Sequence, residues 1–371
     1  MNTLPAFVSE AIDFCLTKTA QNAESLQSFP ELTGPDGKWI CEENGGWVGG
    51  HWTGLLWLAY AHTGQSTFER AARIWTDRLA PRQFDTTTHD LGFLFELSHL
   101  LAAKFTGDES FYSPALQASR TLIRRFNPRG GYFQAWGPLE GTFEQRGRAI
   151  IDTMMNLDML FWASKTSGEP QFADMAVAHA RMAQQRHLRP DGTTSHVTDF
   201  DPETGAFLKQ DTHQGLSATS CWSRGQAWAV YGYAETFRET GDVQFLETSR
   251  LLAEYMLAHQ PADRIPYWDY ASPLIPNDVR DSSAASILSS GLLILAGLET
   301  DPAKAERWTA EAKNMLSALW ENYTSRGCTE ESILIHGTRS KPHNYMDHGL
   351  IYGDYYFLEA LLRLARPDLD L

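Results

Sequence analysis

Cysteine is scarce in this chain of 371 residues, which has only Cys15, Cys41, Cys221 and Cys328 and no CxxC pair. This spacing predicts neither a zinc site nor a disulfide framework. The first twenty residues contain no basic segment followed by an apolar one, so no signal peptide is predicted. No run of about 18 apolar residues occurs, so no membrane-spanning helix is expected. We therefore expect a cytoplasmic protein in a reducing compartment.

Positive charge is also in deficit, with 31 Lys and Arg against 46 Asp and Glu and a formal net charge of −15. An acidic surface disfavours binding to nucleic acid and to anionic membranes. A small anionic substrate remains compatible with it, because charges are screened beyond about 8–10 Å and local cations can dominate a pocket. Hydrophobic residues make up 43% and charged residues 21%, which is typical of a folded protein. We expect one domain over residues 1–371, and the sequence does not distinguish a monomer from a homodimer.

Aromatic residues, in contrast, are plentiful, with 12 Trp, 13 Tyr and 19 Phe. Most of them are expected in the hydrophobic core. Three tryptophans instead stand in polar or glycine-rich segments: Trp47 in NGGWVGG, Trp136 in FQAWGP and Trp228 in RGQAW. Such segments suit sugar rings, which offer one apolar face and a polar rim.

A glycine followed four residues later by phenylalanine recurs between an apolar helical run and a more polar one. The four instances are Gly64 and Phe68, Gly107 and Phe111, Gly168 and Phe172, and Gly241 and Phe245. Glycine commonly ends a helix by adopting the left-handed conformation, and a short turn then starts the next helix. The pattern therefore predicts a series of helix pairs, each held together by its phenylalanine.

Six helix pairs follow from this punctuation. The first members are expected at 50–63, 90–105, 149–166, 223–239, 282–298 and 353–366. The second members are expected at 66–79, 109–126, 170–187, 243–259 and 302–322, and the N-terminal helix at 4–20 pairs with the last helix to close a ring. Because the first members are apolar on most sides and the second carry a polar face, we predict an all-α (α/α)6 toroid of six helix hairpins. An open helical solenoid is the alternative.

The connections between successive pairs are long enough to carry a function. They span 28–48, 128–148, 188–222, 261–281 and 325–352, and in a toroid they line one mouth of the ring. Little strand structure is indicated, although residues 193–201 are expected to form a short hairpin or an extended loop.

Two aspartates are the candidate catalytic residues. Asp90 opens a predicted inner helix in THDLGFLF, and Asp152 lies one turn into another in IIDTMMNL. Asp90 alone is equally compatible with an N-cap, whereas an acid amid Ile, Met and Leu must be paired or face a polar cavity. If both face the cavity of the ring, like charge and desolvation raise the pKa of one of them. Asp90, at a helix N-terminus, is the better candidate to stay ionised, and Asp152 the better proton donor.

Other polar residues are candidates for binding. His89, His196 and His213 lie in polar contexts, but their spacing matches no metal motif, so no metal is expected. Arg224 begins an inner helix in CWSRGQAW, where its planar fork suits a substrate carboxylate. A salt bridge to a neighbouring helix is the alternative for Arg224. Asp281, in RDSSAAS, is expected to be an N-cap.

Several segments resemble those of the unsaturated glucuronyl hydrolases, glycoside hydrolase family 88, in the same order over about 40–366. They are NGGWVGGHWTGLLWLAY, HDLGFLF, FQAWGP, RAIIDTMMNL, THQG, WSRGQAWAVYG, YWDY, RDSSAAS and GDYYFLEALLRL. The resemblance implies an (α/α)6 barrel that removes a 4,5-unsaturated glucuronic acid from the non-reducing end of lyase-generated oligosaccharides. It also implies that no metal or organic cofactor is needed.

The resemblance also assigns roles. Asp152 would protonate C4 of the unsaturated sugar, water would add at C5, and Asp90 would hold substrate hydroxyls. The residues implied in substrate binding are Trp47, Trp136 and Trp228 as an aromatic wall, His89, His196 and Gln214 as polar contacts, and Arg224 as the basic residue. The loop 333–349 departs from the family versions, so the preference for sulfated or unsulfated substrates stays open. His336, Arg339 and Lys341 of this loop are candidates to contact the anion or the next sugar.

Three alternatives remain. An unsaturated rhamnogalacturonyl hydrolase would share the fold and the hydration chemistry but act on pectin fragments. A sugar epimerase of the same fold would rely on paired histidines, and the Asp90 and Asp152 pair argues against it. A non-catalytic oligosaccharide-binding protein is the third.

Overall fold

Two concentric rings of helices make up the molecule, which the computed structural model describes over residues 4–371. The inner segments are α2 (Gly49–Thr63), α4 with η2 and α5 (Leu91–Phe95, Glu96–Leu100, Leu101–Thr106), η5 with α8 (Ile151–Asn156, Asp158–Ser167), α10 (Ser223–Thr240), α12 (Ser282–Leu298) and α14 (Ile351–Ala365). The outer helices are α1 (Ala6–Ser25), α3 (Ser66–Leu79), α6 (Tyr112–Leu122), α9 (Gln171–Arg186), α11 (Val243–Ala258) and α13 (Pro302–Asn322).

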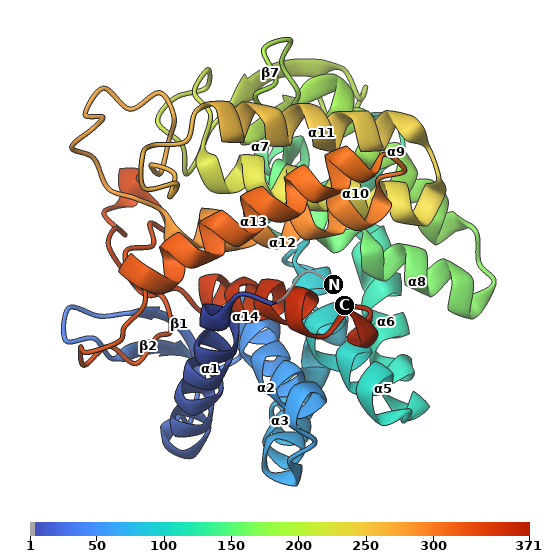
Figure 1. Cartoon of the computed structure of the whole chain (residues 1–371). Helices are drawn as coiled ribbons and strands as arrows, with labels where there is room; N and C mark the ends of the chain where they lie inside the picture. The colour runs from blue at the N-terminus through green and yellow to red at the C-terminus, as the bar shows by residue number, and fades with distance from the viewer. Residues whose placement is uncertain (1–3) are drawn as a thin grey trace.

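The inner segments pack each on the next, and α14 packs against both α12 and α2. Figure 1 shows α14 lying between α12 and α13 on one side and α1 and α2 on the other. This contact closes the ring, so the predicted (α/α)6 toroid is confirmed and the open solenoid is wrong.

Inner and outer helices differ in burial as their sequences predict. Every residue of α2 from Gly49 to Ala59 is buried. In α3 the buried residues are Phe68, Ala72, Trp75, Thr76 and Leu79, a single helical stripe. Helices apolar all round form the centre of the barrel, and amphipathic helices cover them.

The four predicted glycine turns are present. Gly64, Gly107, Gly168 and Gly241 each end an inner helix in the left-handed region, with φ between 68° and 73°. A Cβ at any of them would meet no atom within 4 Å. Glycine is therefore needed at these turns for its backbone conformation and not for space.

Short strands and turns fill the connections. They comprise β1 (Phe29–Thr33), β2 (Trp39–Glu42), η1 (Ala80–Phe84), η3 (Glu109–Phe111), η4 (Ile123–Arg125), β3 (Phe126–Asn127), β4 (Tyr132–Phe133), α7 (Phe143–Arg146), β5 (Arg148–Ile150), β6 (Val197–Phe200), β7 (Phe207–Asp211), η6 (Lys341–His343) and η7 (Pro367–Leu369). Strands β5, β6 and β7 form an antiparallel sheet, so residues 193–201 do contain an extended segment.

The third inner helix does not begin at residue 149, and that prediction is wrong. Residues 148–150 form β5, Ile151–Asn156 form a 3-10 turn, and α8 starts only at Asp158. Strand β5 forms because β6 supplies hydrogen bonds along its edge and Arg148 pairs with Asp199 directly opposite. Helical periodicity within residues 149–166 cannot reveal this partner, since it comes from a segment about fifty residues away.

Two glycines set the spacing between neighbouring inner segments. A Cβ at Gly50 of α2 would lie 1.8 Å from the Phe93 carbonyl oxygen of α4. A Cβ at Gly92 of α4 would lie 2.5 Å from the Asn156 Cα atom of η5. Backbones therefore meet without side chains between them, which brings the start of α4 close to η5.

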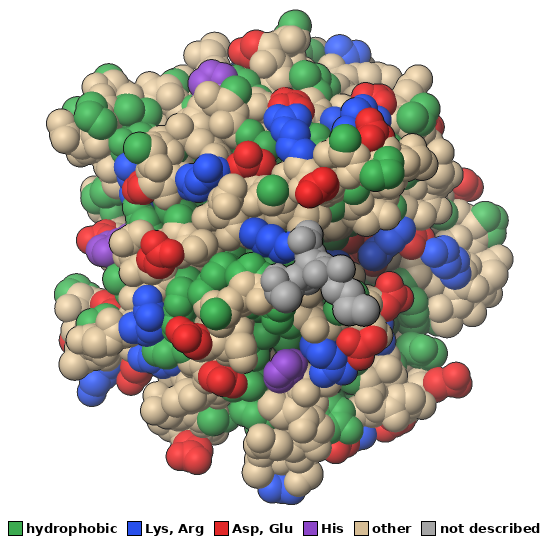
Figure 2. All heavy atoms as spheres, viewed as in Figure 1, with side chains coloured by type: hydrophobic (Ala, Val, Ile, Leu, Met, Phe, Trp, Pro, Cys, Tyr) green, Lys and Arg blue, Asp and Glu red, His purple; other side chains and the backbone are tan. Residues whose placement is uncertain are grey.

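None of the helices in residues 4–371 is long and apolar enough to cross a bilayer. Acidic and basic side chains are interspersed on the face shown in Figure 2. The four cysteines are free thiols.

We expect Gly50→Ala to lower the free energy of unfolding by at least about 2 kcal/mol, because the new methyl group must displace backbone atoms of α4. Gly297→Ala is the matched control, since a Cβ at this helical position of α12 would meet no atom within 4 Å. It should leave stability unchanged or raise it by up to about 1 kcal/mol. Urea denaturation of both variants measures the difference, and equal stabilities would contradict the close contact.

Candidate active site

A cavity of about 410 Å³ opens at one mouth of the ring. The residues that line it are Trp47, His89, Asp90, Trp136, Ile150, Asp152, His213, Gln214, Arg224, Arg339, Ser340, His343 and Tyr345. Most of them come from the long connections or from the first residues of inner helices, as the sequence predicts. The two candidate carboxylates therefore share one hollow.

Asp90 stands at the N-cap position of α4, but its carboxylate does not cap the helix. Oδ2 accepts a hydrogen bond from the Thr88 hydroxyl at 2.9 Å, and Oδ1 lies 3.3 Å from His89 Nε2. The N-cap interpretation of this side chain is therefore wrong, and the carboxylate is available to the cavity.

Asn156 does the capping in place of Asp90. Its side-chain Oδ1, which comes from η5, accepts the Phe93 backbone N–H at 2.9 Å. An amide at a helix start needs such an acceptor because no preceding turn supplies one. This bond leaves Asp90 free and ties α4 directly to the segment that carries Asp152.

His89 connects the same two segments and is 2% exposed. Its Nδ1 lies 2.9 Å from the Thr153 hydroxyl, while Nε2 faces Asp90. Because an ionised carboxylate only accepts, neutral His89 carries its proton on Nε2 and accepts from Thr153 at Nδ1. Burial lowers the pKa of His89, although the nearby Asp90 charge opposes that effect. Both ring nitrogens are thus engaged with protein groups.

Asp152 lies in the first turn of η5 and is 7% exposed. Its Oδ2 makes no hydrogen bond with any residue between 4 and 371. Burial raises the pKa of Asp152 to about 7, with the Arg224 charge lowering it and the Asp90 charge raising it. This carboxyl can therefore hold a proton near neutral pH, as the sequence predicts.

His196 is the nearest imidazole to Asp152, with Nε2 3.6 Å from Oδ2. Its Nδ1 accepts the backbone N–H groups of His213 and Gln214, each at 3.1 Å. Two donors aimed at Nδ1 leave the proton of neutral His196 on Nε2, which faces Asp152. Burial lowers the pKa of His196 well below its usual value. The ring is thus a fixed neutral donor beside the acid.

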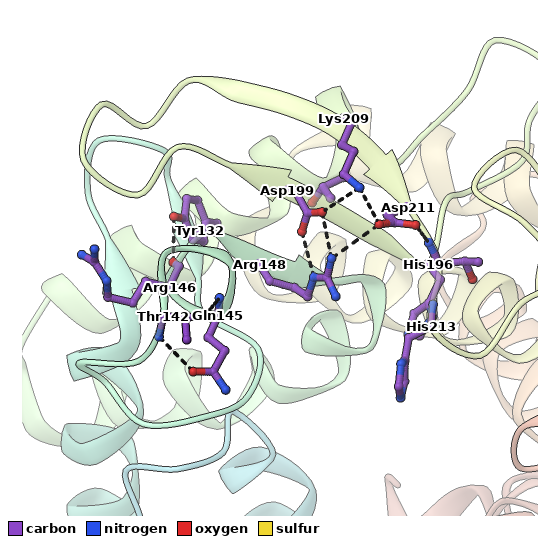
Figure 3. A network of polar contacts seen from close by, with 12 residues as sticks. Tyr132, Thr142, Gln145, Arg146, Arg148, His196, Asp199, Lys209, Asp211 and His213 are labelled. Atoms are coloured by element: carbon purple, nitrogen blue, oxygen red, sulfur yellow. Dashed lines mark hydrogen bonds and ion pairs between the residues drawn. The ribbon is translucent and has the colours of Figure 1, made fainter. Parts of the chain in front are cut away.

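The sheet of β5, β6 and β7 places these residues. Asp152 follows β5, His196 precedes β6, and His213 follows β7, so three distant segments converge at one end of the sheet. Figure 3 shows the ion pairs that fasten it: Arg148 donates twice to Asp199, at 2.8 and 2.9 Å, and Lys209 binds Asp211 at 2.8 Å. The Ile151 N–H continues the ladder to the His196 carbonyl.

The three predicted tryptophans take different places. Trp47 and Trp136 line the cavity, and the Trp136 ring lies 5.4 Å from that of His213. Trp228 of α10 is completely buried and does not line the cavity, although its indole contributes to lowering the pKa of Asp152. Trp228 thus lies behind Asp152, as does His196, which is also absent from the lining.

Arg224 lines the cavity and also makes the alternative salt bridge. Its Nη1 binds Asp281 and donates to the Thr338 carbonyl, while Nη2 donates to the Arg339 carbonyl. Asp281 is the expected N-cap, since it accepts the Ser283 N–H. The Arg224 side chain therefore anchors residues 338–339 over the cavity and leaves only Nε without a partner among the described residues.

Residues 339–345 complete the cavity, and sequence patterns missed most of them. Arg339 lines it and pairs with Glu31 at 2.8 Å, and the Gln214 amide donates to the Arg339 carbonyl at 2.9 Å. Ser340, His343 and Tyr345 have no local motif that marks them. His336 and Lys341 lie outside the lining, where they pair with Asp347 and Asp278 respectively.

Comparisons with known proteins show the family of the chain. The sequence profile described as Glycosyl Hydrolase Family 88 matches residues 19–356. The chain is 38% identical to the unsaturated glucuronyl hydrolase of Bacillus sp. (strain GL1) over 370 residues, covering 96% of each chain. It is 34% identical to the unsaturated chondroitin disaccharide hydrolase of Streptococcus pyogenes serotype M1, covering 97% of this chain and 91% of that protein. The crystal structure of the Bacillus sp. GL1 enzyme superposes with a TM-score of 0.94 at 37% identity, covering 97% of both chains.

We expect Asp152→Asn to stabilise the protein at alkaline pH. The folded-state pKa of Asp152 lies above its unfolded value, so the wild type is stabilised at low pH and loses that stability as the pH rises through about 7. The asparagine variant has no buried charge to form, so its advantage should grow by a few kcal/mol between pH 5 and pH 9. Urea denaturation at both pH values measures this change.

Asp85→Asn provides the control of opposite sign. Asp85 is part-buried, but hydrogen bonds from Thr87 and the ion pair with Arg82 lower its pKa. Its replacement should therefore destabilise the protein at neutral pH. An Asp152→Asn advantage that is the same at pH 5 and pH 9 would contradict the raised pKa.

Proposed function

The chain belongs to glycoside hydrolase family 88, and from that membership we propose that it removes a 4,5-unsaturated glucuronic acid from the non-reducing end of lyase-generated oligosaccharides. The reaction hydrates the C4=C5 double bond. The single observation that carries the mechanism is a buried carboxyl, Asp152, whose pKa is raised to about 7 inside a cavity large enough for a sugar. An acid that holds its proton near neutral pH is what an alkene needs for protonation.

Asp152 acts first as a general acid. It donates its proton to C4, and the positive charge that develops at C5 is shared with the ring oxygen. Water adds at C5 and gives its proton to the Asp152 carboxylate, which restores the starting acid. The resulting hemiketal opens to a ketone, the hydroxyl released on C1 forms a hemiacetal with the leaving sugar, and that hemiacetal collapses. The proton that Asp152 donates to C4 is returned by the attacking water, so these steps balance without a metal or an organic cofactor.

Asp90 holds the sugar hydroxyls in this proposal. Its carboxylate faces the same cavity, and its other contacts, to Thr88 and His89, orient it without neutralising it. The Asp90 charge also raises the pKa of Asp152 and so supports the protonated acid. His196 places a neutral N–H donor 3.6 Å from Asp152 Oδ2 and so adds no charge beside the acid.

The rest of the cavity suits an anionic sugar. Trp47 and Trp136 offer apolar faces to the ring, with Trp228 supporting the wall from behind Asp152. Arg224 and Arg339 supply the positive charge for the substrate carboxylate. Because the side chains of both arginines also make internal ion pairs, with Asp281 and Glu31, we assign them mainly an electrostatic and positioning role. His89 likewise positions Asp90, and Gln214 positions residue 339.

We expect Asp152→Asn to reduce kcat by between about 10²- and 10⁴-fold while leaving substrate binding within a few-fold of wild type. Loss of the alkene absorbance of an unsaturated chondroitin disaccharide measures turnover, and calorimetry with the inactive variant measures binding.

An unsaturated rhamnogalacturonyl disaccharide is the comparison substrate. Faster turnover of the pectin fragment would assign the chain to the alternative hydrolase, and a changed sugar with the alkene intact would indicate an epimerase.

The pH profile should fall on its alkaline side. Because the reactive form of Asp152 is protonated, kcat/KM is expected to fall about tenfold per pH unit above about 7. A saturated aryl glycoside has no C4=C5 double bond to hydrate, so the profile is measured on the unsaturated disaccharide itself. A flat rate up to pH 9 would remove Asp152 from the role of proton donor.

Thr153→Val tests the support of Asp90. The variant removes the hydroxyl that lies 2.9 Å from His89 Nδ1, so the ring that faces Asp90 loses its orientation. Losing one buried hydrogen bond corresponds to about a tenfold fall in kcat. Thr153→Ser keeps the hydroxyl and should stay within about twofold of wild type. If serine and valine behave alike, His89 does not act through this contact.

A further inference from the structure

A second cavity, of about 350 Å³, lies behind the segment that carries Trp136 and shares no lining residue with the active site. It is lined by Arg124, Arg125, Phe126, Asn127, Pro128, Arg129, Gln134, Leu139, Arg146 and Pro202. Four of these residues are arginines, and none is an aspartate or a glutamate. Such a concentration of positive charge is unexpected in a chain whose formal net charge is −15.

Within residues 4–371, only one carboxylate is paired with these four guanidinium groups. Arg146 binds Glu203 Oε1 at 2.7 Å, and Arg129 donates to the Glu203 backbone carbonyl. Arg124 is exposed and makes no side-chain hydrogen bond or ion pair with the part of the chain that the structure describes. Figure 3 shows the Arg146 side chain directed away from Arg148, which instead serves the sheet of the active site.

Arg125 is the buried member of the group, at 2% exposure. Its Nε donates to the Gln134 carbonyl at 2.8 Å, and its Nη1 donates to the carbonyls of Thr86 and Gly137. All three acceptors are neutral, and Nη2 has no partner within residues 4–371. Burial lowers the pKa of Arg125 to about 10 although Asp90 and Asp85 oppose the effect. A buried guanidinium without a bound carboxylate favours an anion from outside.

We propose that this cavity binds a tetrahedral oxyanion, sulfate or phosphate, either free or as an ester on an acidic sugar. Arginine presents paired N–H donors that match two oxygens of such an anion. Three guanidinium groups, those of Arg124, Arg125 and Arg129, have no carboxylate partner in the described part of the chain, so their combined positive charge exceeds what one carboxylate could neutralise. A dianion meets that need, and the volume admits it with its hydration or with an attached sugar.

The position of the cavity gives the anion an effect on the active site. Arg125 holds the carbonyls of residues 134 and 137, and the Gln134 side chain donates to the carbonyl of Trp136 at 3.2 Å. The anion therefore binds against the segment that presents Trp136 to the substrate. It orders that segment from behind without entering the catalytic pocket.

The test compares wild type with an Arg124→Gln/Arg129→Gln double variant, since both side chains are exposed and neither belongs to the catalytic pocket. Arg120→Gln is the matched control, because Arg120 is an exposed arginine of α6 that pairs with Glu169 and does not line this cavity. Calorimetric titrations use sodium sulfate and sodium phosphate at constant ionic strength. Further arms use N-acetylglucosamine 6-sulfate and unsulfated N-acetylglucosamine, which separate free anion from sugar ester.

Wild type and Arg120→Gln should bind the oxyanion saturably, with a dissociation constant on the order of 1 mM. The double variant should bind at least about tenfold more weakly, while its kcat on the unsaturated disaccharide without added anion stays at the wild-type value. If the inorganic anions and the sulfated sugar all bind, the site accepts both the free anion and its sugar ester. If only the inorganic anions bind, its ligand is the free anion. Equal affinity of the double variant and wild type, no saturable binding by wild type, or equal binding of the unsulfated sugar would overturn the proposal.

Discussion

Burial of the Asp152 carboxyl is the constraint on which the rest of the site depends. The carboxyl is buried, its Oδ2 has no hydrogen-bond partner in the described chain, and its pKa is raised to about 7. Burial and the Asp90 charge favour the protonated acid, whereas the Arg224 charge opposes it. Burial lowers the pKa of His196, and two backbone amides leave the proton of the neutral ring on Nε2. The Arg224 guanidinium is shared with Asp281, so neither neighbour drives Asp152 to ionise fully. Ionisation of this buried carboxyl lowers the free energy of unfolding at alkaline pH. Strongly shifted pKa values of this kind are common at functional sites.

A second constraint places Asp90 at the same cavity without using its carboxylate to cap helix α4. Helix α4 needs an acceptor at its start, and Asn156 supplies it from the neighbouring segment. Gly92 allows the two backbones to approach closely enough for that bond. The same contact therefore caps a helix, frees a carboxylate and fixes the distance between the two segments that carry the acids. Thr153 and His89 add a second bridge between them.

The scaffold and the recognition surface are separate parts of the molecule. The ring of inner helices is packed along its length and carries the acids at its mouth. The connections supply most of the side chains that line the cavity. Arg224 and Gln214 hold the loop at the carbonyls of residues 338 and 339, and the ion pairs of Arg339 with Glu31 and of Lys341 with Asp278 hold it further. Because the bonds from Arg224 and Gln214 go to backbone carbonyls, they do not depend on which side chains stand at 338 and 339. Behind Trp136, the arginine-lined cavity bears on the same recognition surface from the opposite side.

The residues themselves determined the architecture, because glycine turns and buried apolar runs are local signals: Gly64, Gly107, Gly168 and Gly241 end the inner helices as predicted. They also marked Asp152, since an acid inside an apolar run must have a polar neighbourhood somewhere. Other features were decided by tertiary structure alone. The strand at 148–150, the release of Asp90 from capping, the internal ion pair of Arg224 and the entry of Ser340, His343 and Tyr345 depend on partners 40 or more residues away in the chain. The tautomer of His196 depends on the backbone of His213 and Gln214, 17 and 18 residues away. A pattern of local periodicity contains no information about such partners, because hydrogen bonds and charges act through space and not along the sequence.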